Sequence, residues 1–235
     1  MTHRPEHRRP NANAESWLIA VALLITVVGC NAPPHGEHDA TAHHSFADVE
    51  HWTKVFDDPE RDEWQKPAEL VKALGIAPGM HVADLGAGTG YFSRYLSVAV
   101  GERGTVFAVD PEPNLVVHLR ERAQRESTAN VVPVLASFDN ARLPTSAVDL
   151  VLIVDTFHHI DDRVNYFVGL KRCLTPTGRV AVVDFKKEPL PVGPPMEHKL
   201  AREQVVEEMQ SAGYRLVDEP SVLPYQYVLV FSVGR

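Results

Sequence analysis

The sequence predicts a doubly wound α/β fold, in which helices cover both faces of a mostly parallel sheet of seven strands that ends in an antiparallel strand. Two observations predict it. From residue 80 onward, short apolar runs alternate with stretches whose apolar residues recur at helical spacing. The run Val148–Val154 is apolar at almost every position, as expected of a central parallel strand buried on both faces.

The remaining elements follow from the same patterns. Apolar residues at positions i, i+3 and i+4 predict helices, and one more helix begins at Pro67 and ends at Gly75. Only a short link separates the last two strands, and this is too short for a parallel crossover, so these strands should be antiparallel. The expected strands are 80–85, 105–109, 131–135, 148–154, 180–183, 214–217 and 227–233, and the expected later helices lie near 92–100, 115–123, 164–174 and 205–212.

The first 29 residues have the composition of an exported protein's signal. Basic residues precede the mainly apolar run from Trp17 to Val28, which is shorter than the about 20 residues that a transmembrane helix needs. The run ends in Val-Val-Gly-Cys at Cys30, which resembles the bacterial lipobox. This resemblance implies cleavage before Cys30, lipid on its sulfur, and a mature lipoprotein on the extracytoplasmic or periplasmic face of a bacterial membrane. The alternatives are an uncleaved membrane anchor and a cytoplasmic protein with a misassigned start codon.

Residues 30–46 are expected to form a flexible tether, because prolines, a glycine and small polar residues there show no hydrophobic period. The tether is rich in histidine, a composition that can bind zinc or copper but more often forms a solvated tether that binds metal weakly, and we expect no specific metal site. Residues 47–235 should form the folded domain. Its first part, 46–64, mixes aromatic residues with carboxylates and predicts an amphipathic segment that packs on the edge of the domain.

Composition excludes some classes of partner. The formal net charge is -8, and the body of the chain has no cluster of lysine and arginine. Nucleic-acid binding proteins usually carry a basic stripe that neutralises phosphates, so we expect no nucleic-acid partner. Besides Cys30 the chain has one cysteine, Cys173, which lies on a predicted helix and is expected in the core.

A glycine-rich turn follows the first strand of the domain. Its glycines, from Gly86 to Gly90, have the spacing G-x-G-x-G, whereas a dinucleotide site requires G-x-G-x-x-G, and Tyr91 stands where the third glycine of that motif belongs. Asp84 lies two residues before the first glycine. A carboxylate there repels a pyrophosphate and attracts the ammonium group of an amino-acid cofactor.

This turn resembles motif I of class I S-adenosylmethionine-dependent methyltransferases, which have a Rossmann-like fold, and the resemblance extends over roughly residues 60–233. It implies S-adenosylmethionine as cofactor. Asp84 would bind the methionine amine, the ribose hydroxyls would bind the acid that ends the second strand, and the adenine amine would bind the acid that follows the third. The implied cofactor site consists of Asp84, Gly86, Ala87, Gly88, Gly90, Asp110, Asp139 and Asp155, the last of which ends the strand-four motif.

Two histidines, His158 and His159, follow the fourth strand, near the expected position of the methyl group. Either is a candidate general base, which methyl transfer needs only if the acceptor must lose a proton. Alternatively, one packs in the core and the other bonds the backbone. No motif identifies the acceptor atom, and the general resemblance is to enzymes with small-molecule acceptors. The oligomeric state stays open.

Two other functions compete with this hypothesis. A nicotinamide-dependent oxidoreductase has a related fold, but the glycine spacing and Asp84 oppose it. A non-catalytic cofactor-binding lipoprotein on the same scaffold would remove a conflict of compartment, because the cofactor is made in the cytoplasm whereas a lipoprotein normally lies outside it.

Overall fold

The computed structural model describes residue 46 and residues 48–234. The signal (1–29) with Cys30, and almost all of the tether (30–46), therefore lie outside the described residues, and the boundaries expected for them stay predictions. Within the part that is described, no helix has the length and apolarity needed to cross a bilayer.

A seven-stranded sheet of order β3-β2-β1-β4-β5-β7-β6 forms the centre of the domain. Strands β1 to β5 run parallel to one another, whereas β7 runs antiparallel to both β5 and β6. This arrangement confirms the predicted fold class. The strands are β1 (His81–Leu85), β2 (Thr105–Asp110), β3 (Val131–Leu135), β4 (Val148–Val154), β5 (Leu174–Phe185), β6 (Tyr214–Asp218) and β7 (Gln226–Val233).

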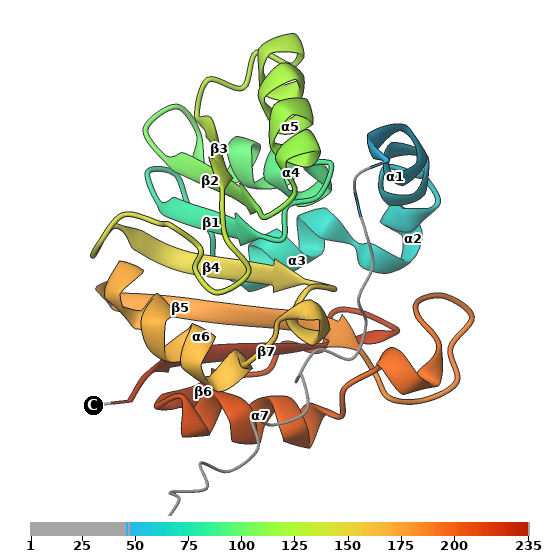
Figure 1. The fold of residues 1–235 in the computed structure, drawn as a ribbon, viewed down its shortest axis with the longest axis vertical. Helices are drawn as coiled ribbons and strands as arrows, with labels where there is room; N and C mark the ends of the chain where they lie inside the picture. Colours follow the sequence, from blue (N-terminus) through green and yellow to red (C-terminus); the bar gives the residue numbers. More distant parts are fainter. Residues whose placement is uncertain (1–45, 47, 235) are drawn as a thin grey trace, which may run out of the picture. The chain divides into compact units, whose positions relative to one another are not determined.

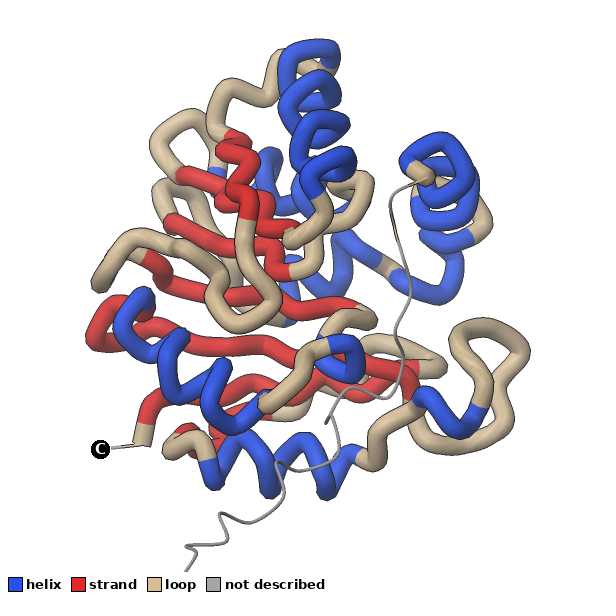
Figure 2. The backbone as a smooth tube through the Cα atoms, in the orientation of Figure 1, coloured by secondary structure: helices blue, strands red, loops and turns tan. Residues whose placement is uncertain are grey.

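Helices cover both faces of the sheet (Figures 1 and 2). Three pack on one face, namely α3 (Pro67–Ala73), α4 (Tyr91–Val100) and α5 (Pro113–Arg125). The other face holds α6 (Arg163–Leu170) and α7 (Arg202–Ser211). Because side chains alternate along a strand, β4 contributes apolar residues to both cores, which explains its nearly unbroken apolar run.

Two short helices, α1 (Val49–Phe56) and α2 (Arg61–Gln65), occupy the segment that was expected to be amphipathic. They lie beyond the carboxyl ends of β1 and β4 (Figure 1). Asp48 begins α1 by accepting a hydrogen bond from the backbone N–H of His51, as an N-cap residue does.

The expected bounds differ most around the fifth strand. We expected a helix up to Leu174 and a strand over 180–183, but α6 ends at Leu170 and β5 extends over 12 residues. The extra length has a structural reason: Leu174 pairs with Val148, and after an irregularity Arg179 pairs with Leu150. Cys173 is buried, as expected.

Candidate functional site

The carboxyl ends of β1, β2, β4 and β5 lie at one edge of the sheet, where open α/β sheets bind ligands. The loop after β1, Gly86–Gly90, is central to this edge. Gly86, Gly88 and Gly90 all have positive φ, at 77°, 56° and 92°. A Cβ on Gly86 would lie 2.3 Å from the Oγ1 atom of Thr156, so this loop packs directly against the loop after β4 and accepts no larger residue there.

Asp110, the last residue of β2, holds this loop in place. Its Oδ2 accepts a hydrogen bond from the N–H of Gly88 at 2.9 Å, and its Oδ1 accepts one from the N–H of Glu112 at the same distance. The side chain is almost fully buried. Burial raises the pKa of Asp110 to about 6, against the opposing effect of the two backbone donors.

Asp84 lies near Asp110 and is also buried. Its Oδ2 accepts a hydrogen bond of 2.7 Å from the hydroxyl of Ser93 on α4. Burial raises the pKa of Asp84 to about 6, while the Ser93 hydroxyl and the charge of Arg61 act in the opposite direction. Two carboxyl groups that burial makes costly to ionise therefore lie next to the glycine loop.

Helix α1 closes over this loop through its last turn. The ring of Phe56 lies 3.4 Å from the position of a Cβ on Gly88. Asp57, which caps α1, accepts a hydrogen bond from the Thr89 hydroxyl at 3.1 Å and pairs with Arg122 of α5 at 2.7 Å. Arg122 also donates to the Thr89 carbonyl at 2.9 Å. We call Asp57, Thr89 and Arg122 the latch, because they join α1, the glycine loop and α5.

Asp155 directly follows β4 and has a φ of 53°, a conformation that residues other than glycine seldom adopt. Its Oδ1 accepts a hydrogen bond from the amide of Gln226, which in turn accepts one from the buried amide of Gln65. Arg61 lies 3.6 Å from its other oxygen. Burial raises the pKa of Asp155 to about 7, with the Arg61 charge opposing this rise and the Asp184 charge adding to it.

His158 is buried beside Asp184, which lies one residue before the end of β5. The exposed fraction is 3% for His158 and 0% for Asp184, and the Nδ1 atom lies 2.8 Å from Oδ2. Burial by itself lowers the pKa of His158, but the charge and hydrogen bond of Asp184 outweigh it, and the pKa is raised. A carboxylate that engages Nδ1 orients the imidazole ring.

His159 lies at a different position, between His158 and an aromatic cluster. Its ring centroid is 4.2 Å from that of His158 and 5.6 Å from that of Phe46. Trp52 and Phe56 of α1 continue the cluster, with centroids 5.0 Å apart. The two histidines therefore differ, since His158 is fixed by a carboxylate and His159 contacts aromatic rings of the N-terminal segment.

Of the expected acids, Asp84 and Asp110 are buried, whereas Asp139 is exposed. Asp139 lies in the exposed loop after β3, where its carboxylate accepts a hydrogen bond of 2.7 Å from the Ser137 hydroxyl, and this bond lowers its pKa. The Cys30 position lies outside the described residues. Among residues 46 and 48–234, no group of three or more histidine, cysteine or acidic side chains is placed to hold a metal ion.

Sequence reasoning missed Asp184 and the latch. Asp184 follows the expected strand 180–183 directly, so the rule that singled out the acids after the earlier strands would also have found it. The latch has no such signal, because Asp57 and Arg122 are 65 residues apart and belong to no shared motif.

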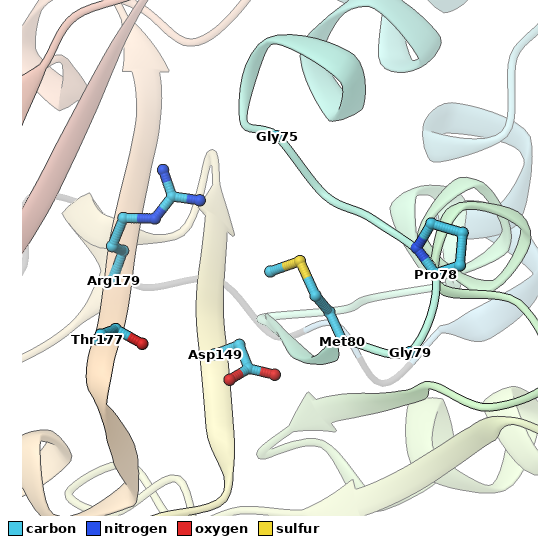
Figure 3. A pocket seen from close by; sticks show the side chains of 7 residues that line it. All are labelled: Gly75, Pro78, Gly79, Met80, Asp149, Thr177 and Arg179. Carbon is cyan, nitrogen blue, oxygen red and sulfur yellow. The ribbon is translucent and has the colours of Figure 1, made fainter.

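A shallow hollow of about 420 Å³ lies at the opposite, amino-terminal edge of the sheet (Figure 3). Arg179 and Asp149 are its charged residues, and each has neighbours in the fold. Arg179 donates to the Leu74 carbonyl at 2.9 Å, and Asp149 accepts from the His81 N–H at 2.9 Å. Both charged groups already have hydrogen-bond partners, and the glycine loop lies at the other edge of the sheet. This hollow is therefore a poor candidate for the functional site.

Comparison with known proteins points to the same part of the chain. The methyltransferase domain family matches residues 83–182, which run from β1 through most of β5. The chain is 28% identical over 118 residues to the ubiquinone/menaquinone biosynthesis C-methyltransferase UbiE of Shewanella piezotolerans. That alignment covers 50% of this chain and 47% of the relative, so the chain matches about half the length of that relative.

Solved structures have a similar fold. An S-adenosylmethionine-dependent methyltransferase from Aquifex aeolicus superposes with a TM-score of 0.75 at 29% identity, over 80% of this chain and 98% of that one. The [4+2]-cyclase SpnF has the same fold, with a TM-score of 0.57 at 18% identity over 66% of this chain and 58% of its own. The same fold therefore also occurs in a protein that is named for a different reaction. Residues 83–182 thus match the methyltransferase domain family, and the fold of the described residues is that of an S-adenosylmethionine-dependent methyltransferase.

Proposed function

We propose that this chain transfers the methyl group of S-adenosylmethionine to a small-molecule acceptor. The observation that carries the proposal is the pair of buried carboxyl groups, Asp84 and Asp110, around a glycine loop at the carboxyl edge of the sheet. A buried carboxyl group with a raised pKa is costly to ionise, and a cationic or hydroxyl-bearing ligand offsets that cost.

The side chains of this edge fit the cofactor. Each oxygen of Asp110 accepts one backbone N–H, and a carboxylate oxygen has two acceptor sites, so each retains one for a ribose hydroxyl. Asp84 would pair with the ammonium group. The loop Gly86–Gly90, with Ala87, would form the floor of the site, and Asp139 would bind the adenine amine. Asp155 would contribute through Arg61, whose charge faces both Asp155 and Asp84.

The cofactor supplies a sulfonium that makes its methyl group electrophilic. The chain's own contribution is to align the acceptor with that group and to exclude water, which lowers the barrier chiefly through positioning. Helix α1 is placed to exclude water, since Phe56 covers Gly88 and the latch joins the end of the helix to the glycine loop.

A small-molecule acceptor is supported by the names of the relatives. The Shewanella relative is named for C-methylation in ubiquinone and menaquinone biosynthesis, and the net charge of -8 gives no support for a nucleic-acid acceptor. Because the chain matches only half of that relative, its acceptor does not transfer to this chain by similarity alone.

The test has a binding arm and a turnover arm. Calorimetry should show that the full-length protein binds S-adenosylmethionine and S-adenosylhomocysteine. Incubation with panels of oxygen, nitrogen and carbon acceptors should then yield S-adenosylhomocysteine, detected by mass spectrometry. Binding without turnover on any panel favours the non-catalytic cofactor-binding protein, and absence of binding contradicts the proposal.

We also propose that the chain is a lipoprotein with lipid on Cys30. The proposal is supported by the basic N-terminal residues, the apolar run Trp17–Val28 and the cysteine that ends it. Cell fractionation of the wild type beside Cys30→Ser, with mass spectrometry of the N-terminal peptide, tests it. The wild type should be in the membrane fraction with a diacylated Cys30, and an unmodified N-terminus in the cytosol would contradict the proposal.

A further inference from the structure

Asp155 directly follows β4, and its side chain can be reached from solvent, with an exposed fraction of 23%. We propose that Asp155 faces the sulfonium of S-adenosylmethionine and makes the site bind this cofactor more tightly than S-adenosylhomocysteine, whose sulfur carries no charge. This inference rests on the proposed methyl transfer and adds to it how the site distinguishes the cofactor from its product.

The location of Asp155 suits this role. Strand β4 lies beside β1, with Ile153 paired to Leu85, so the residues that follow the two strands are neighbours (Figure 1). Thr156, the residue after Asp155, packs against Gly86, where a Cβ would lie 2.3 Å from the Thr156 Oγ1 atom. The glycine loop that would form the floor of the cofactor site therefore adjoins Asp155.

Side chains from two other elements orient this carboxyl group through one of its oxygens. The amide of Gln226 on β7 donates a hydrogen bond to Oδ1, and its own oxygen accepts one from the amide of Gln65 on α2. Of the described residues, none donates a hydrogen bond to Oδ2. Arg61 lies 3.6 Å from this oxygen, which is longer than a hydrogen bond. Oδ2 is therefore the atom that can face a ligand.

Arg61 is held in place by other groups and makes only a loose ion pair with Asp155. Its Nε and Nη2 atoms both donate to the Gln65 side chain, at 3.2 and 3.1 Å, and Nη1 donates to the Phe56 carbonyl at 3.2 Å. The guanidinium also lies over the ring of Tyr91, 4.2 Å from its centroid. These contacts keep the arginine from closing on Oδ2, so the carboxylate can attract a second cation.

The charges around the glycine loop also match the cofactor better than its product. Arg61 acts on both Asp84 and Asp155, so these two carboxylates share one guanidinium when they are ionised. S-adenosylmethionine carries an ammonium, a sulfonium and a carboxylate, and its single net positive charge balances the remaining negative one. S-adenosylhomocysteine has no net charge and leaves that negative charge unbalanced.

The attraction requires that Asp155 is ionised, so it depends on pH. Burial raises the pKa of Asp155 to about 7, and the charge of Asp184 on β5 adds to this rise. The charges of Arg61 on α2 and of His158 after β4 oppose it. The phenol of Tyr227 on β7, which also faces Asp155, has a raised pKa and stays neutral. The preference for S-adenosylmethionine should therefore be small at pH 5 and grow as the pH rises toward about 7.

Calorimetry on the full-length protein, with both ligands from about pH 5 to about pH 7.5, tests the proposal. The ratio of the two dissociation constants isolates the sulfonium, because the ligands share their ammonium, ribose and adenine. In the wild type, the preference for S-adenosylmethionine should increase at least about fivefold over this range. Asp155→Asn should lose the increase and bind S-adenosylhomocysteine nearly as the wild type does. Asparagine tolerates the φ of 53° at this position.

Asp84→Asn is the matched control within the site. It changes a carboxyl group that would meet the shared ammonium, so it should weaken both ligands alike and keep the wild-type ratio. Asp155→Gly covers the case in which Asp155→Asn does not fold, since glycine adopts a positive φ readily, and its ratio should not change with pH.

The proposal is overturned if the ratio of the wild type does not change with pH. It is also overturned if a folded Asp155 variant keeps the wild-type change, because His158 and Asp184 would then be its source. Failure of the wild type to bind either ligand would instead contradict the proposed function itself, so the two failures are distinguishable.

Discussion

The two edges of this sheet are built from the same strands but have opposite character. At the amino edge, the two charged residues that line the hollow of about 420 Å³ in Figure 3, Asp149 and Arg179, already have hydrogen-bond partners. At the carboxyl edge, Asp84, Asp110 and Asp155 are carboxyl groups whose pKa values burial raises to about 6, 6 and 7. Only the second edge carries an electrostatic cost that a ligand can relieve.

The raised pKa values of these carboxyl groups make the stability of the fold depend on pH in a definite direction. A carboxyl group whose pKa is raised by folding stabilises the fold while it is protonated, below about pH 4, and this stabilisation is lost as the pH rises through about 6. A difference of one in pKa between the folded and the unfolded chain corresponds to about 1.4 kcal/mol of stability. Near neutral pH the carboxyl edge is thus less stable than it would be with neutral residues, as is common at functional sites. The charged groups of the hollow at the amino edge already have hydrogen-bond partners, so its empty volume gives no comparable indication of a functional site.

The largest expected difference between the edges concerns cofactor affinity. Asp110→Ala should weaken binding of S-adenosylmethionine at least tenfold, because a charge-assisted hydrogen bond contributes about 1.5–3 kcal/mol and two ribose hydroxyls are involved. The matched change at the amino edge, Asp149→Asn, should leave the dissociation constant unchanged. Calorimetry measures both, with thermal unfolding as the check on folding. Equal effects at the two edges would remove the distinction between them.

A second difference should appear on changing the pH. The dissociation constant of S-adenosylhomocysteine, a stable ligand, should increase at least about tenfold between pH 7 and pH 5, since Asp84 and Asp110 become protonated below about pH 6 and no longer attract the ligand. Asp84→Asn should bind more weakly at pH 7 and show a flatter profile. If the wild type binds equally well at both pH values, these carboxyl groups do not contact the ligand.

The parts of the candidate site that the sequence could predict are those that follow the order of the strands, and the roles of these residues stay predictions. Asp84 and Asp110 could be found because each lies at the end of an apolar strand, and parallel strands bring their carboxyl ends to one edge. Asp184 also lies at the end of a parallel strand and could have been found in the same way, but the resemblance to the methyltransferases assigned no role to that position. The prediction of the bounds of β5 was wrong, because pairing of Leu174 with Val148 extends the strand beyond its apolar core.

Tertiary packing decides what the sequence could not predict. The segment 46–64 was expected to be amphipathic, yet its pattern does not reveal that Phe56 covers Gly88 or that Asp57 reaches Arg122. Both contacts join residues that are far apart in the chain, and no local spacing encodes them. For the same reason, the exposed position of Asp139 does not follow from its place after the third strand.

A smaller effect is expected from the latch. Asp57→Asn should speed the release of S-adenosylhomocysteine about fivefold, since a partly buried ion pair of about 1 kcal/mol holds α1 against the glycine loop. Glu126 provides the matched control, because it pairs with the same arginine at 2.8 Å but follows α5 at its C-cap and does not join α1 to the loop. Stopped-flow measurements should therefore show unchanged release for Glu126→Gln. Similar rates for both variants would mean that α1 does not retain the ligand.

The smallest effect should come from the hollow at the amino edge. Arg179→Met removes the hydrogen bond to the Leu74 carbonyl, at the C-cap of α3, and should lower the free energy of unfolding by about 1 kcal/mol. Cofactor affinity should stay within about twofold of the wild type, because Arg179 pairs with Leu150 at the beginning of the parallel region of β4 and β5, away from the residues that follow their carboxyl ends. Urea unfolding and calorimetry on the same preparations separate the two quantities. A change in cofactor affinity larger than the change in stability would show that the hollow, despite its satisfied walls, takes part in binding.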